Sequence, residues 1–173
     1  PQIEPFVKNH DGEVRDGFME EIRNGDWVLC RNLKPLVLMN LYFLSIGRKS
    51  YIKGKDIGIS LIGLITKIGC ENTRAMLIKY KAMISKERMK LISLGVKNPD
   101  NTEKMDNMNQ KFDILYVLSE GVDSAKVLKN KIKEIFKEQG EGICLSTIHK
   151  SKGLEDNNVF IACPELIPSK YAK

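Results

Sequence analysis

The chain has few of the residues that build metal centres and disulfide frameworks. It contains four cysteines and two histidines among 173 residues. The cysteines are scattered without a Cys-x-x-Cys pair, and His10 lies far from His149, so the sequence predicts neither a zinc site nor a disulfide framework. We expect the cysteines to be buried, reduced thiols of a cytoplasmic protein.

Long apolar runs are also missing. No run reaches the roughly 20 residues that a membrane-spanning helix needs, and no signal peptide opens the chain. We therefore expect no membrane partner. The first residue is Pro1 rather than Met, so we expect the chain to be a piece of a longer protein.

The sequence lacks a phosphate loop. Residues 47–50 resemble the end of such a loop, but Arg48 separates the glycine from the lysine, and Tyr42 stands where an earlier glycine is needed. No other stretch supplies a complete catalytic site. This absence argues against an unrelated α/β enzyme that works alone.

The totals describe one ordinary globular domain. Hydrophobic residues make up 42% and charged residues 29% of a chain that is long enough for one sizeable core. The 28 Lys and Arg residues exceed the 22 Asp and Glu residues, which gives a net charge of +6. This mild excess of positive charge is compatible with a nucleic-acid partner.

The first half of the chain carries the pattern of a strand, a helix and a second strand. Residues 26–30 and 49–52 are short, largely apolar runs, and residues 33–46 between them are apolar around most of a helix. Asn32 stands at the position of a helix cap, and Gly47 can end the helix in the left-handed conformation. Because such units join parallel strands by a right-handed crossover, we expect both runs in one sheet.

Two more apolar runs, 142–148 and 158–162, predict further strands of that sheet. We therefore expect an α/β fold, with a mainly parallel sheet and helices on both faces. The predicted helices after the second strand are 57–68, 71–94, 108–119 and 124–138, with a polar loop over 95–107. The lysines of the second of these helices could meet DNA, although charged side chains opposite an apolar stripe are usually just solvated.

A polar turn separates the last two predicted strands. Residues 149–155 hold an imidazole, two lysines, a serine, a glycine and a glutamate. Open α/β folds bind ligands at the carboxyl ends of their strands, where we expect this turn. Its side chains suit phosphate and sugar chemistry. The simplest alternative is a solvated turn with incidental charges.

The order Thr147-x-His149-x-x-Lys152-Gly153-Leu154-Glu155 resembles motif V of the UvrD/Rep-like superfamily 1 DNA helicases. Residues 29–32 and 47–54 resemble motif IV of the same family. The resemblance implies a RecA-like domain of the P-loop NTPase type. It identifies residues 1–173 as the second RecA-like domain of such a helicase, with 55–122 as a reduced, helical form of the domain inserted between these motifs.

The resemblance also implies a role for each motif residue. Arg31 corresponds to the arginine that reaches the γ-phosphate of ATP, so it would be both catalytic and cofactor-binding. Glu155 would accept hydrogen bonds from the ribose, and Gly153 would shape the turn beside the nucleotide. The residues that would bind single-stranded DNA are Thr147, His149 and Lys152. The Mg²⁺ that accompanies ATP would be held by the N-terminal RecA-like domain of the same protein.

Some alternatives remain open. Cys30 and Asp156 stand where the family often has aromatic residues, so this chain departs from the family pattern at both positions. Arg31 by itself is typical of a strand-end arginine in a surface ion pair. The whole chain could be a non-catalytic DNA-binding or protein-docking domain that keeps the helicase fold. A phosphate loop and an Asp-Glu pair upstream in the complete reading frame would favour the motor.

Overall fold

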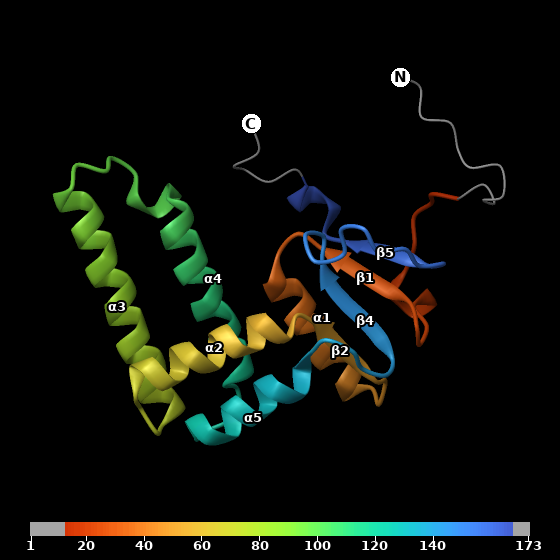
Figure 1. Cartoon of the computed structure of the whole chain (residues 1–173), viewed down its shortest axis with the longest axis horizontal. Helices are drawn as coiled ribbons and strands as arrows, with labels where there is room; N and C mark the ends of the chain where they lie inside the picture. Colours follow the sequence, from red (N-terminus) through yellow and green to blue (C-terminus); the bar gives the residue numbers. More distant parts are fainter. Residues whose placement is uncertain (1–12, 168–173) are drawn as a thin grey trace.

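The structure, a computed structural model, describes residues 13–167 and contains a five-stranded sheet (Figure 1). All pairings between the strands are parallel, and the strand order is β3-β2-β4-β1-β5. The strands are β1 (Trp27–Cys30), β2 (Ser50–Lys53), β3 (Phe136–Lys137), β4 (Ile143–Thr147) and β5 (Val159–Ala162). The predicted parallel sheet is confirmed. Strand β3 was not expected, because Phe136 continues the apolar stripe of the helix before it.

The register of the sheet brings the carboxyl ends of three strands to one level. Cys30 pairs with Thr147 of β4 on one side and with Ala162 of β5 on the other. The backbone N–H of Ile148 then donates to the carbonyl of Cys30 at 3.1 Å, which keeps the two chains together one residue beyond β4. The segments that follow β1 and β4 therefore start side by side.

Helix α1 (Leu33–Ser45) covers one face of the sheet. It contacts β1, β2 and β4 and lies behind them in Figure 1. Leu36, Val37 and Phe43 on its inner side are fully buried. Asn40 is buried beside them, and its Nδ2 donates to Ser50 Oγ at 2.9 Å. This polar contact ties the helix to the beginning of β2.

Helices α2 (Lys55–Ile68) and α5 (Ala125–Ile135) pack against each other and against β3. Gly58 lets α2 approach closely, because a Cβ at this position would lie 2.8 Å from the Cβ of Phe136. The outer face of β5 is open, with Val159 47% exposed and Ile161 57% exposed. In the described part of the chain, α1, α2 and α5 thus pack on the sheet, while the outer face of β5 stays open.

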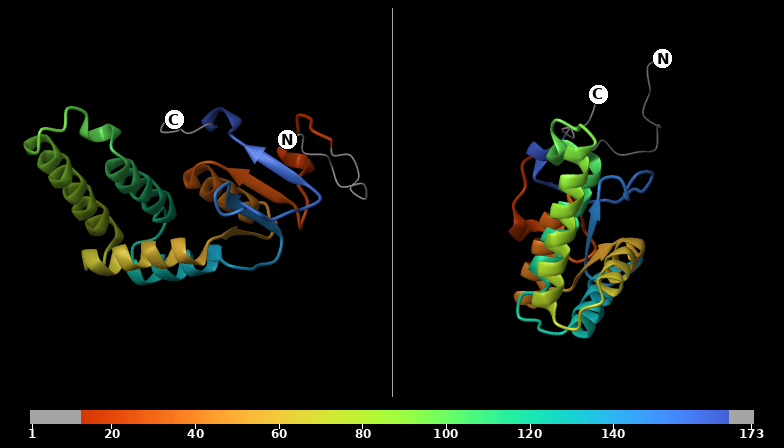
Figure 2. Two further views of the ribbon diagram at one scale, coloured as in Figure 1. Left: turned by 45° about the horizontal axis from the view of Figure 1, so that its top comes forward. Right: turned by 90° about the vertical axis from the view of Figure 1, so that its left-hand side faces the viewer.

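Helices α3 (Thr73–Ser93) and α4 (Glu103–Leu118) form a hairpin that projects away from the sheet (Figure 2). Helix α4 begins five residues before the predicted start because Thr102 caps it, with the N–H of Met105 donating to Thr102 Oγ1 at 3.3 Å. The prediction of a loop as far as residue 107 is therefore wrong. Within residues 13–167 there are also three short 3₁₀ helices: η1 (Met19–Glu21), η2 (Pro99–Asn101) and η3 (Pro164–Leu166).

Helices α2, α3 and α4, called the helical insertion below, share one continuous apolar core with the sheet. Met76 and Tyr80 of α3 are buried against α4, which contributes Leu115 and Leu118. The hydroxyl of Tyr80 donates to the carbonyl of Met108 at 3.2 Å, and burial raises the pKa of this phenol to about 12. Among the described residues, no helix combines the length and the apolar character needed to cross a bilayer.

Candidate functional site

Two predicted site residues from distant parts of the chain meet at the carboxyl edge of the sheet. Arg31 follows β1 and His149 follows β4, and Nη1 of the arginine lies 2.9 Å from Nδ1 and 2.7 Å from Nε2 of the imidazole. A guanidinium has only N–H donors, so the imidazole accepts through a ring nitrogen that carries no proton. The parallel register of the two strands is what brings these side chains together.

The turn after β4 is held by its own backbone. The N–H groups of Lys150 and Ser151 donate to the carbonyl of Thr147 at 2.9 and 3.1 Å. The N–H of Leu154 donates to the carbonyl of Ser151 at 3.0 Å. Gly153 has a φ of +80° with open space around it, so this position needs glycine for its conformation rather than for room. Backbone hydrogen bonds and the conformation of Gly153 therefore shape the turn.

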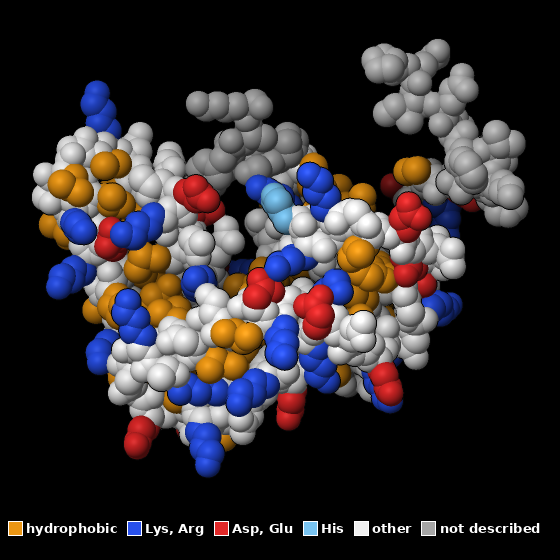
Figure 3. Space-filling view, in the orientation of Figure 1, with side chains coloured by type: hydrophobic (Ala, Val, Ile, Leu, Met, Phe, Trp, Pro, Cys, Tyr) orange, Lys and Arg blue, Asp and Glu red, His pale blue; other side chains and the backbone are white. Residues whose placement is uncertain are grey.

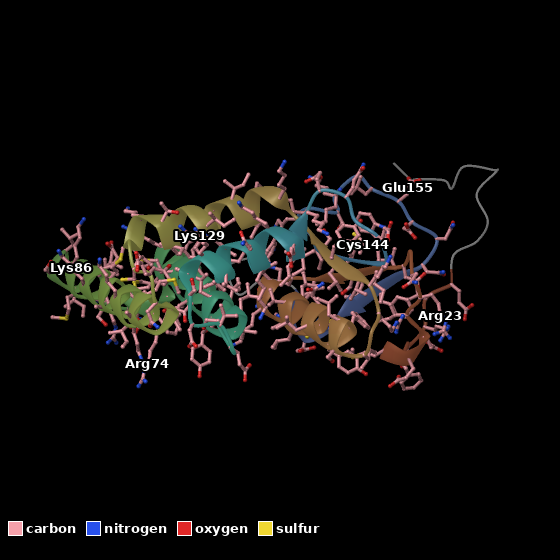
Figure 4. All side chains as sticks on the ribbon, turned by 90° about the horizontal axis from the view of Figure 1, so that it is seen from below. Arg23, Arg74, Lys86, Lys129, Cys144 and Glu155 are labelled. Atoms are coloured by element: carbon pink, nitrogen blue, oxygen red, sulfur yellow. The ribbon has the colours of Figure 1, made fainter. Side chains whose placement is uncertain are left out.

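Lys152 and Glu155 lie exposed on this turn. Within residues 13–167 neither side chain forms a hydrogen bond or an ion pair, so both charges face solvent and are available to a ligand. Figure 4 shows Glu155 on the turn, far from the helical hairpin. After this turn the chain returns to the amino end of the strands, where the N–H of Trp27 donates to the carbonyl of Asn158 at 3.1 Å. No contact joins Glu155 to Arg31 directly.

A cleft of about 660 Å³ opens beside Arg31 and Thr147. Its second wall comes from the helical insertion, with Asp56 of α2 and Gln110 and Lys111 of α4 among the lining residues. The sequence does not predict this cleft, because its two walls come from segments that lie far apart in the chain. The cleft is open and is lined by both polar and apolar side chains, and two of the motif residues, Arg31 and Thr147, lie on its wall.

One ion pair joins the turn to the insertion. Lys150 Nζ lies 2.7 Å from Asp56 Oδ2, and this hydrogen bond lowers the pKa of the Asp56 carboxyl below its ordinary value. Both side chains are largely exposed. Lys150 carries no role in the motif pattern, and its contact could not be found from spacing alone.

Two of the cysteines lie buried in the core. Cys30 and Cys144 are buried, free thiols, and burial raises the pKa of each. Among the described residues, no group of three His, Cys, Asp or Glu side chains is placed to hold a metal ion. The chemical groups that the motif residues offer at this edge are a guanidinium, an imidazole, a hydroxyl, a lysine and the carboxylate of Glu155.

Comparison with protein families agrees with this geometry. A family model described as the UvrD-like helicase C-terminal domain matches residues 48–173. The matched range includes β4 and the whole polar turn, and it begins after Arg31. A search of curated proteins and a search of solved structures each gave no match. The predicted family and its RecA-like α/β fold are confirmed.

Proposed function

We propose a motor function for this chain, which belongs to the family of UvrD-like helicase C-terminal domains. In this proposal it is the second RecA-like domain of an ATP-dependent DNA helicase. It forms one wall of the ATP cleft and part of the track for single-stranded DNA. The observation that supports this function best is the meeting of Arg31 and His149, which are 118 residues apart, at the carboxyl edge of the sheet.

Arg31 is the residue that acts on ATP. Within residues 13–167 its side chain contacts His149 and pairs with no carboxylate, so its charge is not neutralised by the domain itself. A planar guanidinium can donate two parallel hydrogen bonds to phosphate oxygens. The transition state of phosphoryl transfer spreads charge over the γ-phosphate oxygens, and Arg31 stabilises that charge from across the cleft.

His149 links the nucleotide to the DNA. It contacts Arg31 and lies on the same turn as Lys152, just beyond Thr147 at the end of β4. These three polar residues bond to phosphates of the single strand. The contact between His149 and Arg31 connects a residue on the DNA side to a residue on the ATP side, and this contact couples hydrolysis to DNA.

The remaining motif residues hold the nucleotide. Glu155 accepts hydrogen bonds from the ribose hydroxyls, a task that suits its free carboxylate. Gly153, with its positive φ, allows the bend in the turn that carries this carboxylate. Mg²⁺ binds with ATP and is held by the N-terminal RecA-like domain, which also supplies the phosphate loop and activates water.

Measurements of ATP hydrolysis test this function. The purified chain should show no turnover above background, because it lacks a phosphate cradle and a group that activates water. The longer protein that carries this chain should hydrolyse ATP faster when single-stranded DNA is added. Turnover by the chain alone, or a longer protein that ignores DNA, would favour the alternative of a non-catalytic docking domain.

A further inference from the structure

A groove of about 500 Å³ runs along the outer side of α2 and α5, where these helices reach β3. It is separate from the cleft beside Arg31, because the two open on different sides of α2. Ile59, Ile62 and Phe136 give it an apolar floor. Ile59 is 60% exposed beside these apolar neighbours. The floor is therefore an apolar surface without a partner inside the described chain.

Lysines border this floor. Lys55, Lys133 and Lys137 line the groove, and in the part of the chain that the structure describes none of them forms an ion pair. The one carboxylate among the lining residues, Glu138, is already paired with Lys53 at 3.0 Å. The groove thus carries uncompensated positive charge.

The charge continues along α5 beyond the groove. Lys126, Lys129 and Lys133 are spaced three and four residues apart, so they follow one side of the helix. In Figure 3, hydrophobic side chains over α2 and α5 are bordered by Lys and Arg side chains. Figure 4 shows Lys129 on α5, far from the turn that carries Glu155. This part of the lysine row therefore lies away from the proposed DNA residues.

We propose that this groove docks a short, acidic, amphipathic helix of another protein. Apolar side chains of the helix fill the floor over Ile59 and Ile62, and its carboxylates pair with Lys133 and Lys137. A helix that binds in a groove commonly places its apolar side chains three and four residues apart, so that they lie on one face. A DNA strand fits less well, because its phosphates would meet the lysines while its sugars and bases left the aliphatic floor uncovered. The opposite charges of groove and helix favour the docking of a peptide.

Fluorescence anisotropy with a labelled peptide tests the proposal on the purified chain. The probe is a helical peptide of about 12 residues made of Glu, Ala and Leu, with the leucines at i and i+4 on one side. The double variant Lys133→Glu, Lys137→Glu should weaken binding about tenfold or more, because it places like charges opposite each other. Ile59→Asp should weaken binding to a similar extent.

Matched controls come from helix α3. The double variant Lys86→Glu, Lys90→Glu makes the same change of charge at two exposed lysines, and Figure 4 shows Lys86 at the end of the molecule far from the sheet. Ile78→Asp places a charge on an isoleucine that is 64% exposed, close to the exposure of Ile59. Both control variants should bind the peptide like the unaltered chain. Circular dichroism checks that each variant keeps its helices.

Three results would overturn the proposal. The first is equal binding by the groove variants and the controls. The second is undiminished binding of a peptide whose leucines are replaced by serine, since the apolar floor would then have no role. The third is a single-stranded oligonucleotide that binds more tightly than the peptide and loses affinity in the lysine double variant, which would make this surface a nucleic-acid site.

Discussion

Two cationic regions of this chain differ in what surrounds their charges. At the carboxyl edge of the sheet, Arg31 and Lys152 lie among a hydroxyl, an imidazole and a glycine turn. In the α2–α5 groove, Lys133 and Lys137 lie beside aliphatic side chains such as Ile59. A polar setting suits phosphate, whereas an apolar floor needs a partner that also brings apolar groups. Positive charge alone therefore does not identify the partner.

The largest expected effect is on the rate of ATP hydrolysis, which should depend on the sheet edge and not on the groove. In a helicase that joins this chain to an N-terminal RecA-like domain, as proposed above, Arg31→Ala should lower kcat for DNA-stimulated ATP hydrolysis by about 10³-fold or more. Only contacts that strengthen in the transition state change kcat in this way. The affinity for single-stranded DNA should stay nearly the same. Steady-state ATPase assays and DNA titrations measure the two quantities.

Two further variants control this experiment. His149→Ala should weaken DNA binding and the stimulation by DNA, while the basal ATPase persists. Lys133→Glu in the groove should alter neither quantity. If Arg31→Ala kept the turnover of the unaltered protein, Arg31 would be a surface residue without a catalytic role.

The next effect concerns the packing that forms the groove. Gly58→Val should lower the free energy of unfolding by about 1–3 kcal/mol, because the added side chain would overlap Phe136 and push α2 away from β3. Gly63 lies on the same helix with open space around it, and the same change there should alter stability by no more than about 0.5 kcal/mol. Urea denaturation gives both values. Equal effects at the two glycines would show that α2 does not rest closely on β3.

The sequence predicts the sheet edge better than the groove for a physical reason. Buried parallel strands are continuous apolar runs, so four of the five could be recognised, and motif V keeps its residues within nine positions of one turn. The groove depends on one stripe of α2 and one stripe of α5, which are about 70 residues apart in sequence. No local pattern contains both stripes.

Smaller differences follow from local competition. Phe136 and Lys137 form a strand where the sequence predicts the end of a helix, because their backbone pairs with Ile52 and Lys53 of β2. Thr102 begins α4 early, although the residues around it read as a polar loop. The contact between Arg31 and His149 depends on strand register, which the apolar runs alone do not determine.

The third prediction tests whether the sheet edge binds phosphate. Lys152→Ala should reduce the slope of log affinity against log salt for single-stranded DNA by about one unit, because one fewer counterion is released. Fluorescence anisotropy over a range of salt concentrations gives this slope. Lys133→Glu should leave it unchanged if the groove does not bind DNA. An unaltered slope in Lys152→Ala would mean that this lysine does not touch a phosphate.

The smallest expected effect concerns the ion pair that joins the edge to the insertion. Lys150 lowers the pKa of Asp56 in the folded chain. A carboxyl with a lowered pKa adds stability above its unfolded pKa of roughly 3.9, and this stability is lost as the pH falls through the folded value. Because both side chains are largely exposed, Asp56→Asn should cost at most about 1 kcal/mol at neutral pH.

The difference between Asp56→Asn and the unaltered chain should therefore shrink as the pH falls from about 4. Asp56 also lies in the first turn of α2, where the helix dipole favours a negative charge, so part of its contribution does not depend on Lys150. Lys150→Gln and the double variant complete a cycle that isolates the ion pair. Urea denaturation between neutral and acidic pH measures all four chains. If the coupling free energy between Asp56 and Lys150 stayed constant down to acidic pH, it could not come from an ionised Asp56. The contact would then stabilise the chain without the charge of the carboxylate.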